Sequence, residues 1–265
     1  MKKIRIFSII LFVIAVAAFA GCRMYAEMMT DHTPPVISGG EAIEVSVEDP
    51  EEKLLEGMTA SDKRDGDVTD SLVVQEISEF DDKGVRTVRY AAVDDSGNVS
   101  YSSRPMTYSD YREPEFMLSE PLRFPMGGAF NVCQGISASS VLDGDLSNSI
   151  KYTLDRAIST TAPGTYEVEF RVMDSAGRTS YLKTQIEVYD PTEERIEVEL
   201  SDYLVYVSQG ASFKPDDYFK GSSAEDGELD IMSKVDTSKA GAYYVDYTVT
   251  TKQLEGKSRL VVVVR

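Results

Sequence analysis

The stretch Gly164-Thr165-Tyr166-Glu167-Val168-Glu169-Phe170-Arg171-Val172-Met173-Asp174-Ser175-Ala176-Gly177 decides the fold of this chain. Its apolar side chains alternate with charged ones from Tyr166 to Val172, which is the period-2 pattern of a strand with one buried face and one solvated face. The last four residues, Asp174 to Gly177, are typical of a tight turn. We therefore expect a half-buried strand that leads into a hairpin.

The same pattern occurs twice more. It stands 80 residues earlier as Gly84, Val88, Tyr90, Ala92, Asp94, Asp95 and Gly97, and 77 residues later as Gly241, Tyr243, Val245, Tyr247 and Val249. An internal period near 80 residues indicates small repeated modules. Short alternating strands separated by turn signals favour β-sandwiches. We predict an all-β chain of three tandem sandwiches at 33–110, 113–190 and 195–265. The third is the most divergent, with a longer hairpin turn from Thr251 to Gly256 and a last strand from Leu260 to Val264.

Residues 1–30 differ in character from the rest. Lys2, Lys3 and Arg5 precede an uncharged apolar run from Ile6 to Gly21, which is the arrangement of a secretory signal. Three fates stay open: cleavage, lipidation at Cys22 in the lipobox-like Phe19-Ala20-Gly21-Cys22, or retention as a signal anchor. The basic N-terminus predicts that the modules lie on the extracytoplasmic side of the membrane.

Charge excludes some partners. The chain has 27 Lys and Arg and 45 Asp and Glu; residues 1–30 hold four of the former and one of the latter, which leaves 23 against 44, a net charge of −21. Nucleic acids and anionic lipid surfaces attract basic footprints, so neither is an expected ligand of the modules. Acidity also keeps a displayed protein soluble.

Several motifs resemble a known family. They are Pro34-Pro35-Val36-Ile37, Ala60-Ser61-Asp62, Asp65-Gly66-Asp67-Val68-Thr69 and Asp94-Asp95-Ser96-Gly97-Asn98. This set is similar to the bacterial immunoglobulin-like domain first named for pesticidal crystal proteins. The second module resembles it through Asp143-Gly144-Asp145-Leu146 and the stretch from Pro163 to Gly177. The resemblance implies Ig-like sandwiches of about seven strands, used in surface proteins as spacers or adhesive units, and it implies no enzyme.

The sequence contains few of the residues that catalytic sites commonly use. The single histidine, His32, lies in the linker before the first module, so no histidine-based triad is available. Paired carboxylates act in glycosidases only when they face each other across a cleft, which small sandwiches seldom provide. We expect the protein not to be an enzyme.

Clustered aspartates in the turns are the one chemical signal. Calcium prefers six to eight oxygen ligands of this kind, although the spacing is not that of an EF-hand. The alternative is that these side chains cap turns by accepting backbone N–H bonds. The candidate calcium ligands are Asp62, Asp65, Asp67 and Asp94 in the first module and Asp143, Asp145 and Asp174 in the second.

These observations predict a membrane-tethered bacterial surface protein. Its modules are expected to bind or adhere at the envelope, with an unidentified protein or glycan as ligand. The alternative is a passive stalk or a partner subunit of an envelope complex. Aromatic residues of the third module, among them Tyr206, Phe213 and Tyr218, are expected to form a recognition tip.

Overall fold

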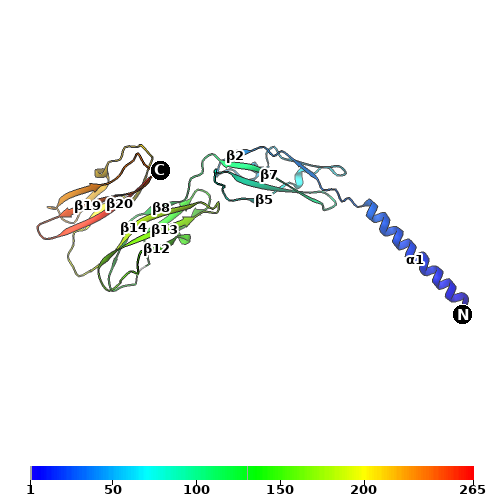
Figure 1. Cartoon of the computed structure of the whole chain (residues 1–265), viewed down its shortest axis with the longest axis horizontal. Helices are drawn as coiled ribbons and strands as arrows, with labels where there is room; N and C mark the ends of the chain where they lie inside the picture. Colours follow the sequence, from blue (N-terminus) through cyan, green and yellow to red (C-terminus); the bar gives the residue numbers. More distant parts are fainter. Residues whose placement is uncertain (1, 130) are drawn as a thin grey trace. The chain divides into compact units, whose positions relative to one another are not determined.

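The computed structural model describes residues 2–129 and 131–265, with side chains for residues 5–129 and 131–265. Figure 1 labels several of its elements and colours the chain from blue at the N-terminus to red at the C-terminus. They form two compact units, residues 1–110 and residues 111–265. Helix α1 (Lys2–Met29) opens the first unit, and strands dominate everything after it.

Helix α1 forms because its residues are mostly apolar helix formers, and it ends just before Asp31 and the Pro34-Pro35 pair, which cannot continue a helix. Its side chains are exposed from Arg5 onward. The segment Arg5–Met29 is long and apolar enough, by length and composition, to cross a membrane. At 1.5 Å per residue its 25 residues span about 37 Å.

Two sheets form the sandwich of the first unit. One has the order β1-β3-β4 and the other the order β2-β7-β6-β5, in which β2 pairs with β7 in parallel and the other pairs are antiparallel. The strands are β1 (Val36–Ser38), β2 (Ile43–Val45), β3 (Thr59–Asp62), β4 (Gly66–Asp67), β5 (Val73–Ile77), β6 (Arg86–Val93) and β7 (Val99–Tyr108), with 3-10 turns at Glu51–Leu55 and Thr69–Ser71.

The core of this sandwich contains a buried polar link. Tyr90 is fully buried on β6, and its hydroxyl donates to the Leu54 carbonyl oxygen at 2.6 Å. Arg104 on β7 is 5% exposed and donates to the Tyr90 hydroxyl at 2.8 Å and to the Glu56 carbonyl at 2.9 Å. Buried polar groups are stable only when such partners are present. The link therefore holds the Glu51–Leu55 turn against the sheet.

The second unit contains two sets of sheets that repeat this plan. In each set a short strand pairs in parallel with the last long strand, β9 with β14 and β16 with β20. The sheets have the orders β11-β10-β8 and β12-β13-β14-β9, then β15-β17 and β16-β20-β19-β18. The strands of the first set are β8 (Glu115–Leu118), β9 (Arg123–Pro125), β10 (Ile136–Ser140), β11 (Gly144–Asp145), β12 (Lys151–Leu154), β13 (Gly164–Met173) and β14 (Thr179–Tyr189), with a 3-10 turn at Ser147–Ser149. Those of the second are β15 (Val198–Leu200), β16 (Leu204–Val207), β17 (Phe219–Ser222), β18 (Glu228–Ser233), β19 (Gly241–Thr250) and β20 (Glu255–Val264), with a 3-10 turn at Pro215–Tyr218.

The predicted alternation is confirmed in β13, the strand of the opening stretch. Tyr166, Val168, Phe170 and Val172 are all buried, while every second residue between them faces outward. Gly177 closes the turn that follows by donating its N–H to the Asp174 carbonyl, at a φ of +82° that glycine adopts without strain. The prediction of tandem β-sandwiches after an N-terminal apolar helix is confirmed. The exact module boundaries stay predictions.

One expected boundary inside the third module is wrong. The sequence suggested a long turn from Thr251 to Gly256, with the last strand starting at Leu260, but β20 begins at Glu255. Gly256 lies in the strand because the backbone of Ile196 packs directly against it. A Cβ at this position would overlap the Ile196 carbonyl oxygen and lie 2.7 Å from the Ile196 Cβ. The glycine therefore marks a close approach of two segments and not a turn.

The two sandwiches of the second unit share one hydrophobic cluster, which includes Phe116 and Phe170 from the first and Tyr247 and Leu260 from the second. Polar contacts cross between them as well. The Tyr206 hydroxyl accepts the Phe116 N–H at 2.8 Å. The two sandwiches are thus packed together as one body.

Candidate functional site

Three aspartates meet at one end of the first sandwich. Asp62 ends β3, Asp94 follows β6, and Asp31 precedes β1. Because β1 pairs with β3 in the register Val36↔Ser61, the residues before Val36 run past Asp62. One carboxylate oxygen of each aspartate lies within 4.8 Å of one of each other. Within residues 5–129 and 131–265, this is the one group of three or more His, Cys, Asp or Glu side chains placed to share a metal ion.

The hydrogen bonds of these aspartates are unevenly distributed. Asp62 Oδ1 accepts the N–H groups of Arg64 at 2.6 Å and Asp65 at 3.0 Å, whereas Asp62 Oδ2 is buried and has no hydrogen-bond partner. Asp94 accepts two bonds from Asn98, one from the backbone and one from the side chain, both at 2.8 Å. Asp31 Oδ1 accepts the Thr33 N–H at 2.9 Å. One oxygen of this cluster is therefore left unsatisfied.

Both buried carboxylates favour the ionised form. The backbone N–H groups of Arg64 and Asp65 hold the pKa of Asp62 below its usual value. Burial acts to raise the pKa of Asp94, but the hydrogen bonds from Asn98 outweigh it and the net pKa is lowered, even against the charge of Asp62. The residues are only 7% and 6% exposed. Two anions therefore face each other away from water.

Asn98 connects this cluster to the linker. Its side-chain amide donates to the Asp94 carboxylate and to the backbone carbonyl of Asp31, the latter at 3.1 Å. The same nitrogen lies 3.4 Å from the Thr33 carbonyl oxygen. The turn after β6 therefore holds the segment that precedes β1.

The other predicted ligands of the first module lie outside the group. Asp65 Oδ2 accepts the Asp95 N–H at 3.1 Å, and Asp67 Oδ1 accepts the Thr69 N–H at 2.9 Å. Hydrogen bonding to the Thr69 hydroxyl and N–H lowers the pKa of Asp67. Both side chains thus cap turns, which is the alternative that the sequence left open.

The second module has a different arrangement at the equivalent place. Asp174 is the counterpart of Asp94, but Ser140 stands where the first module has Asp62. The Tyr111 hydroxyl donates to Asp174 Oδ2 at 2.6 Å, and the N–H groups of Ala176 and Arg178 donate to Oδ1. Burial and this hydrogen bond to Asp174 raise the pKa of Tyr111, so the phenol stays a donor. A neutral hydroxyl therefore satisfies the carboxylate here.

Asp143 and Asp145 also accept hydrogen bonds within the second module. Asp143 Oδ2 accepts the Ser175 N–H at 2.9 Å, and Asp145 Oδ1 accepts the Ser147 N–H at 2.9 Å and its hydroxyl at 2.5 Å. Neither belongs to a group that the described residues place around a common point.

Asp31 was not among the ligands predicted from the sequence. It lies in the linker before the first module, and its sequence neighbours do not distinguish it from an aspartate that ends a helix. The signal that identifies it is the pairing of β1 with β3, which brings it beside two residues far along the chain.

Comparisons with known proteins find distant relatives in sequence and distant matches in structure. No family model matches the chain. It is 29% identical over 206 residues to the pesticidal crystal protein Cry22Aa of Bacillus thuringiensis, covering 74% of this chain and 28% of that protein. It is 28% identical over 150 residues to an uncharacterized 81.3 kDa protein of Acholeplasma phage L2, covering 53% of this chain and 20% of that protein. The crystal structure of Drosophila N-cadherin EC1-4 matches with 15% identity and a TM-score of 0.23, covering 89% of this chain and 76% of that one.

The chain is a β-sandwich repeat protein. It spans about a quarter or less of the length of the curated relatives that it matches.

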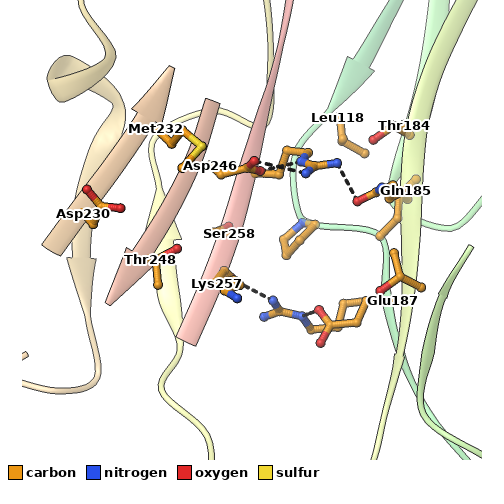
Figure 2. Close-up of a pocket in the computed structure, with 15 residues that line it drawn as sticks. Leu118, Thr184, Gln185, Glu187, Asp230, Met232, Asp246, Thr248, Lys257 and Ser258 are labelled. Atoms are coloured by element: carbon orange, nitrogen blue, oxygen red, sulfur yellow. Dashed lines mark hydrogen bonds and ion pairs between the residues drawn. The ribbon is translucent and has the colours of Figure 1, made fainter. Parts of the chain in front are cut away.

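A groove of about 450 Å³ lies between the two sandwiches of the second unit (Figure 2). Arg259 on β20 forms a bidentate pair with Asp246 and donates to the Gln185 side chain at 2.5 Å. Arg123 pairs with Glu187 at 2.6 Å and donates to the Lys257 carbonyl at 2.7 Å. Figure 2 draws these contacts as dashed lines across the groove. The two arginines therefore bridge the sandwiches, and each already donates three hydrogen bonds to this chain's own groups.

Two exposed tyrosines occupy the same repeat position. Tyr101 and Tyr181 stand 80 residues apart, on β7 and β14, and their exposed fractions are 53% and 59%. Each lies beside a further exposed apolar residue on the outer face of its own sheet, Val93 at 40% and Met173 at 56%. The Arg89 guanidinium lies 4.7 Å from the centre of the Tyr101 ring.

The aromatic residues of the third module that are expected to form a recognition tip are only partly exposed. Tyr206, Phe213 and Tyr218 are half-buried against the hydrophobic cluster, and the Phe213 and Tyr218 rings stack with their centroids 5.5 Å apart. A recognition tip at these residues stays a prediction, because the Tyr206 hydroxyl contacts the second module and the other two rings pack against the hydrophobic cluster.

Proposed function

We propose that this protein is a non-enzymatic, membrane-tethered bacterial surface protein whose β-sandwich modules bind a protein or glycan at the cell envelope. The observation that carries the proposal is the repeated exposure of a tyrosine at one position in two modules, Tyr101 and Tyr181. Exposed aromatic rings contribute much of the binding energy at protein and sugar interfaces, and a repeat presents the same contact more than once.

Helix α1 supports the tether. It is apolar over Arg5–Met29, and its side chains are exposed along that whole length, which a lipid environment would explain. Lys2, Lys3 and Arg5 precede the apolar run, which favours a cytoplasmic N-terminus and extracytoplasmic modules. Lipidation at Cys22 is the competing form of attachment. The thiol is exposed on the helix.

A non-enzymatic role is supported by the chemistry of the side chains. His32 is the single histidine of the chain and lies outside the sandwiches. The groove between the second and third modules is lined by arginines that are already paired. The acidic surface, with a net charge of −18 for the whole chain, disfavours nucleic acid as the ligand.

Membership of the crystal-protein Ig-like type is part of this proposal. Its support is the set of motifs around Asp62 and Asp94 together with the 29% identity to Cry22Aa over 206 residues.

Binding is tested with Tyr101→Ser and Tyr181→Ser in the full chain, reconstituted in lipid nanodiscs. Wall glycans and extracts of surface proteins are presented to the wild type and to the double variant. We expect at least about a tenfold loss of binding in the double variant, the typical effect of removing aromatic contact residues. Met117→Ser is the control, because Met117 is 51% exposed on β8, in the other sheet of the second module.

A passive stalk is the second candidate. The bridging contacts of Arg123 and Arg259 favour it, because they hold two sandwiches together as a spacer requires. Equal binding by the wild type and the double tyrosine variant, or no binding by either, would contradict the binding proposal and leave the stalk.

The form of attachment is tested with Cys22→Ala and membrane fractionation. An anchor helix keeps the variant in the membrane in unchanged form, whereas a lipoprotein variant accumulates as unprocessed precursor. Release of wild-type protein into the medium would contradict both forms of tether.

A further inference from the structure

The aspartate cluster of the first module has two properties that turn capping does not explain. Its three carboxylates come from three separate segments and have no salt bridge to Lys, Arg or His among the described side chains. The nearest arginine in sequence, Arg64, directs its guanidinium to the Met29 carbonyl at 2.6 Å. Three negative charges at close range repel one another, and Arg64 attracts Asp62 without forming a salt bridge to it.

The second property is the buried oxygen of Asp62. The residue is 7% exposed, and Oδ2 has neither solvent contact nor a hydrogen-bond partner. A carboxylate oxygen accepts up to two bonds, and leaving it bare in a protein interior is costly. Oδ1 already satisfies the loop amides of Arg64 and Asp65, so the loop does not need Oδ2. The free oxygen is instead available to the group that Asp31 and Asp94 complete.

We propose that Asp31, Asp62 and Asp94 bind one calcium ion, which ties the linker after α1 to the end of the first sandwich. This inference goes beyond the proposed binding function, because it assigns a cation and a structural role that do not depend on any envelope ligand.

The size of the cluster fits calcium. Two oxygens on opposite sides of a calcium ion, each about 2.4 Å from it, are about 4.8 Å apart. The three carboxylate oxygens lie within this upper limit of one another, so one calcium ion can reach all three. Magnesium demands near-octahedral geometry at about 2.1 Å and usually keeps several waters, so a cluster of protein carboxylates suits calcium better. All three ligands are oxygens, which zinc and copper prefer less than sulfur or imidazole nitrogen.

Because Asp31 lies in the linker between α1 and β1, an ion bound to it would act on that linker. Asp31 lies between the end of α1 at Met29 and the start of β1 at Val36, whereas Asp62 and Asp94 belong to the sandwich. The Asn98 amide already fixes the Asp31 backbone. A shared cation adds the Asp31 side chain and offsets the charge repulsion that otherwise pushes the linker away. Calcium is therefore expected to restrict the linker.

The second module supplies an internal control. There Ser140 replaces the Asp62 carboxylate and the Tyr111 hydroxyl satisfies Asp174, so the equivalent place has one carboxylate in place of three. One calcium ion per chain is expected from this difference, and not two.

The test uses the full chain in detergent micelles, freed of metal with a chelator. Equilibrium dialysis against radioactive Ca²⁺ measures stoichiometry and affinity. We expect one ion per chain with a Kd of about 10⁻⁴–10⁻³ M, the range of extracellular modules. Asp62→Asn and Asp31→Asn each remove one charged ligand and should weaken binding at least about tenfold, or about 1.4 kcal/mol. The amide oxygen that Asp62→Asn introduces can still accept the loop N–H bonds, so folding should be retained.

Asp174→Asn and Asp65→Asn are the matched controls and should bind calcium as the wild type does. A second measurement, hydrogen exchange, should show slower exchange of the Thr33 and Asn98 amides in calcium, an effect absent from Asp31→Asn. The proposal is overturned by any of three results: no saturable binding at several millimolar calcium, undiminished binding by Asp62→Asn, or equal affinity for Mg²⁺. Loss in Asp62→Asn with full binding by Asp31→Asn would overturn the role of the linker.

Discussion

Tyr111 shows how one side chain changes the chemistry of a repeated site. In the second module the Tyr111 hydroxyl donates to Asp174 Oδ2, whereas the first module places the Asp62 carboxylate close to Asp94. A neutral donor satisfies an anion without adding charge. The equivalent turns of the two modules therefore differ in chemistry, with a hydroxyl beside the aspartate in one and further carboxylates in the other.

Tyr111→Phe should destabilise the second unit. It leaves Asp174 Oδ2 without its side-chain donor in a residue that is 4% exposed, which costs about 1–3 kcal/mol. Urea unfolding followed by tyrosine fluorescence measures the change. Tyr181→Phe, whose ring is mostly exposed, should change the free energy of unfolding by less than about 0.5 kcal/mol. Equal effects of the two substitutions would show that the buried hydrogen bond is not important.

The lowered pKa of Asp190 predicts how the stability of the protein depends on pH. Bonds from the Thr192 hydroxyl and N–H lower the pKa of Asp190 from 3.8. A lowered folded-state pKa contributes stability above the unfolded pKa, and this stability is lost as pH falls through the folded pKa. In Thr192→Val the pKa of Asp190 should rise toward the usual value of an aspartate, and carboxyl-carbon NMR titration measures this change. The stability difference between variant and wild type should be present at neutral pH and shrink in acid. A pKa unaffected by the substitution would exclude the hydroxyl as the main cause.

Strands in this protein are positioned by the alternation of apolar and polar side chains and also by close contacts between backbone segments. The pairing of β19 with β20 runs from Gly241↔Val264 to Thr250↔Glu255 without interruption, which brings the start of β20 beneath the Ile196 backbone. A residue without a side chain is required there, although nothing in its sequence neighbours indicates it.

Gly256→Ala should therefore destabilise the third sandwich by about 1–3 kcal/mol, the usual cost of overpacking. Thermal unfolding of the full chain measures the change. Gly128→Ala is the matched control in the same unit, because a Cβ at Gly128 meets nothing closer than 3.9 Å. If both variants melt at the wild-type temperature, the contact with Ile196 is looser than the structure shows.

At the scale of the whole molecule, the second unit is expected to unfold as one body. Its two sandwiches share a hydrophobic cluster and are joined by the polar contacts of Arg123 and Arg259. Arg123 is largely buried, with 12% of its side chain exposed. Breaking such charged contacts leaves partners desolvated and unpaired, which costs more than losing an exposed pair.

The double variant Arg123→Met and Arg259→Met should separate this cooperative transition into two. Calorimetry of the full chain measures whether the peak assigned to residues 111–265 broadens or splits. Lys183→Met is the control, since its pair with Glu169 is exposed and should contribute less than about 1 kcal/mol. A single unchanged transition in the double variant would show that the hydrophobic cluster alone couples the sandwiches.

Local sequence patterns were enough to predict the repeat and most of its strands and turns. Tyr166, Val168, Phe170 and Val172 indicate a half-buried strand because side-chain alternation depends only on neighbouring residues. Gly177 indicates a turn for an equally local reason, its positive φ. Tertiary structure alone decided which aspartates meet: Asp65 and Asp67 are near Asp62 in sequence but cap turns, whereas Asp31 and Asp94 are distant and converge on it. That convergence depends on strand register and on the packing of two sheets, and both are set by the sum of contacts across the sandwich, which no local pattern contains.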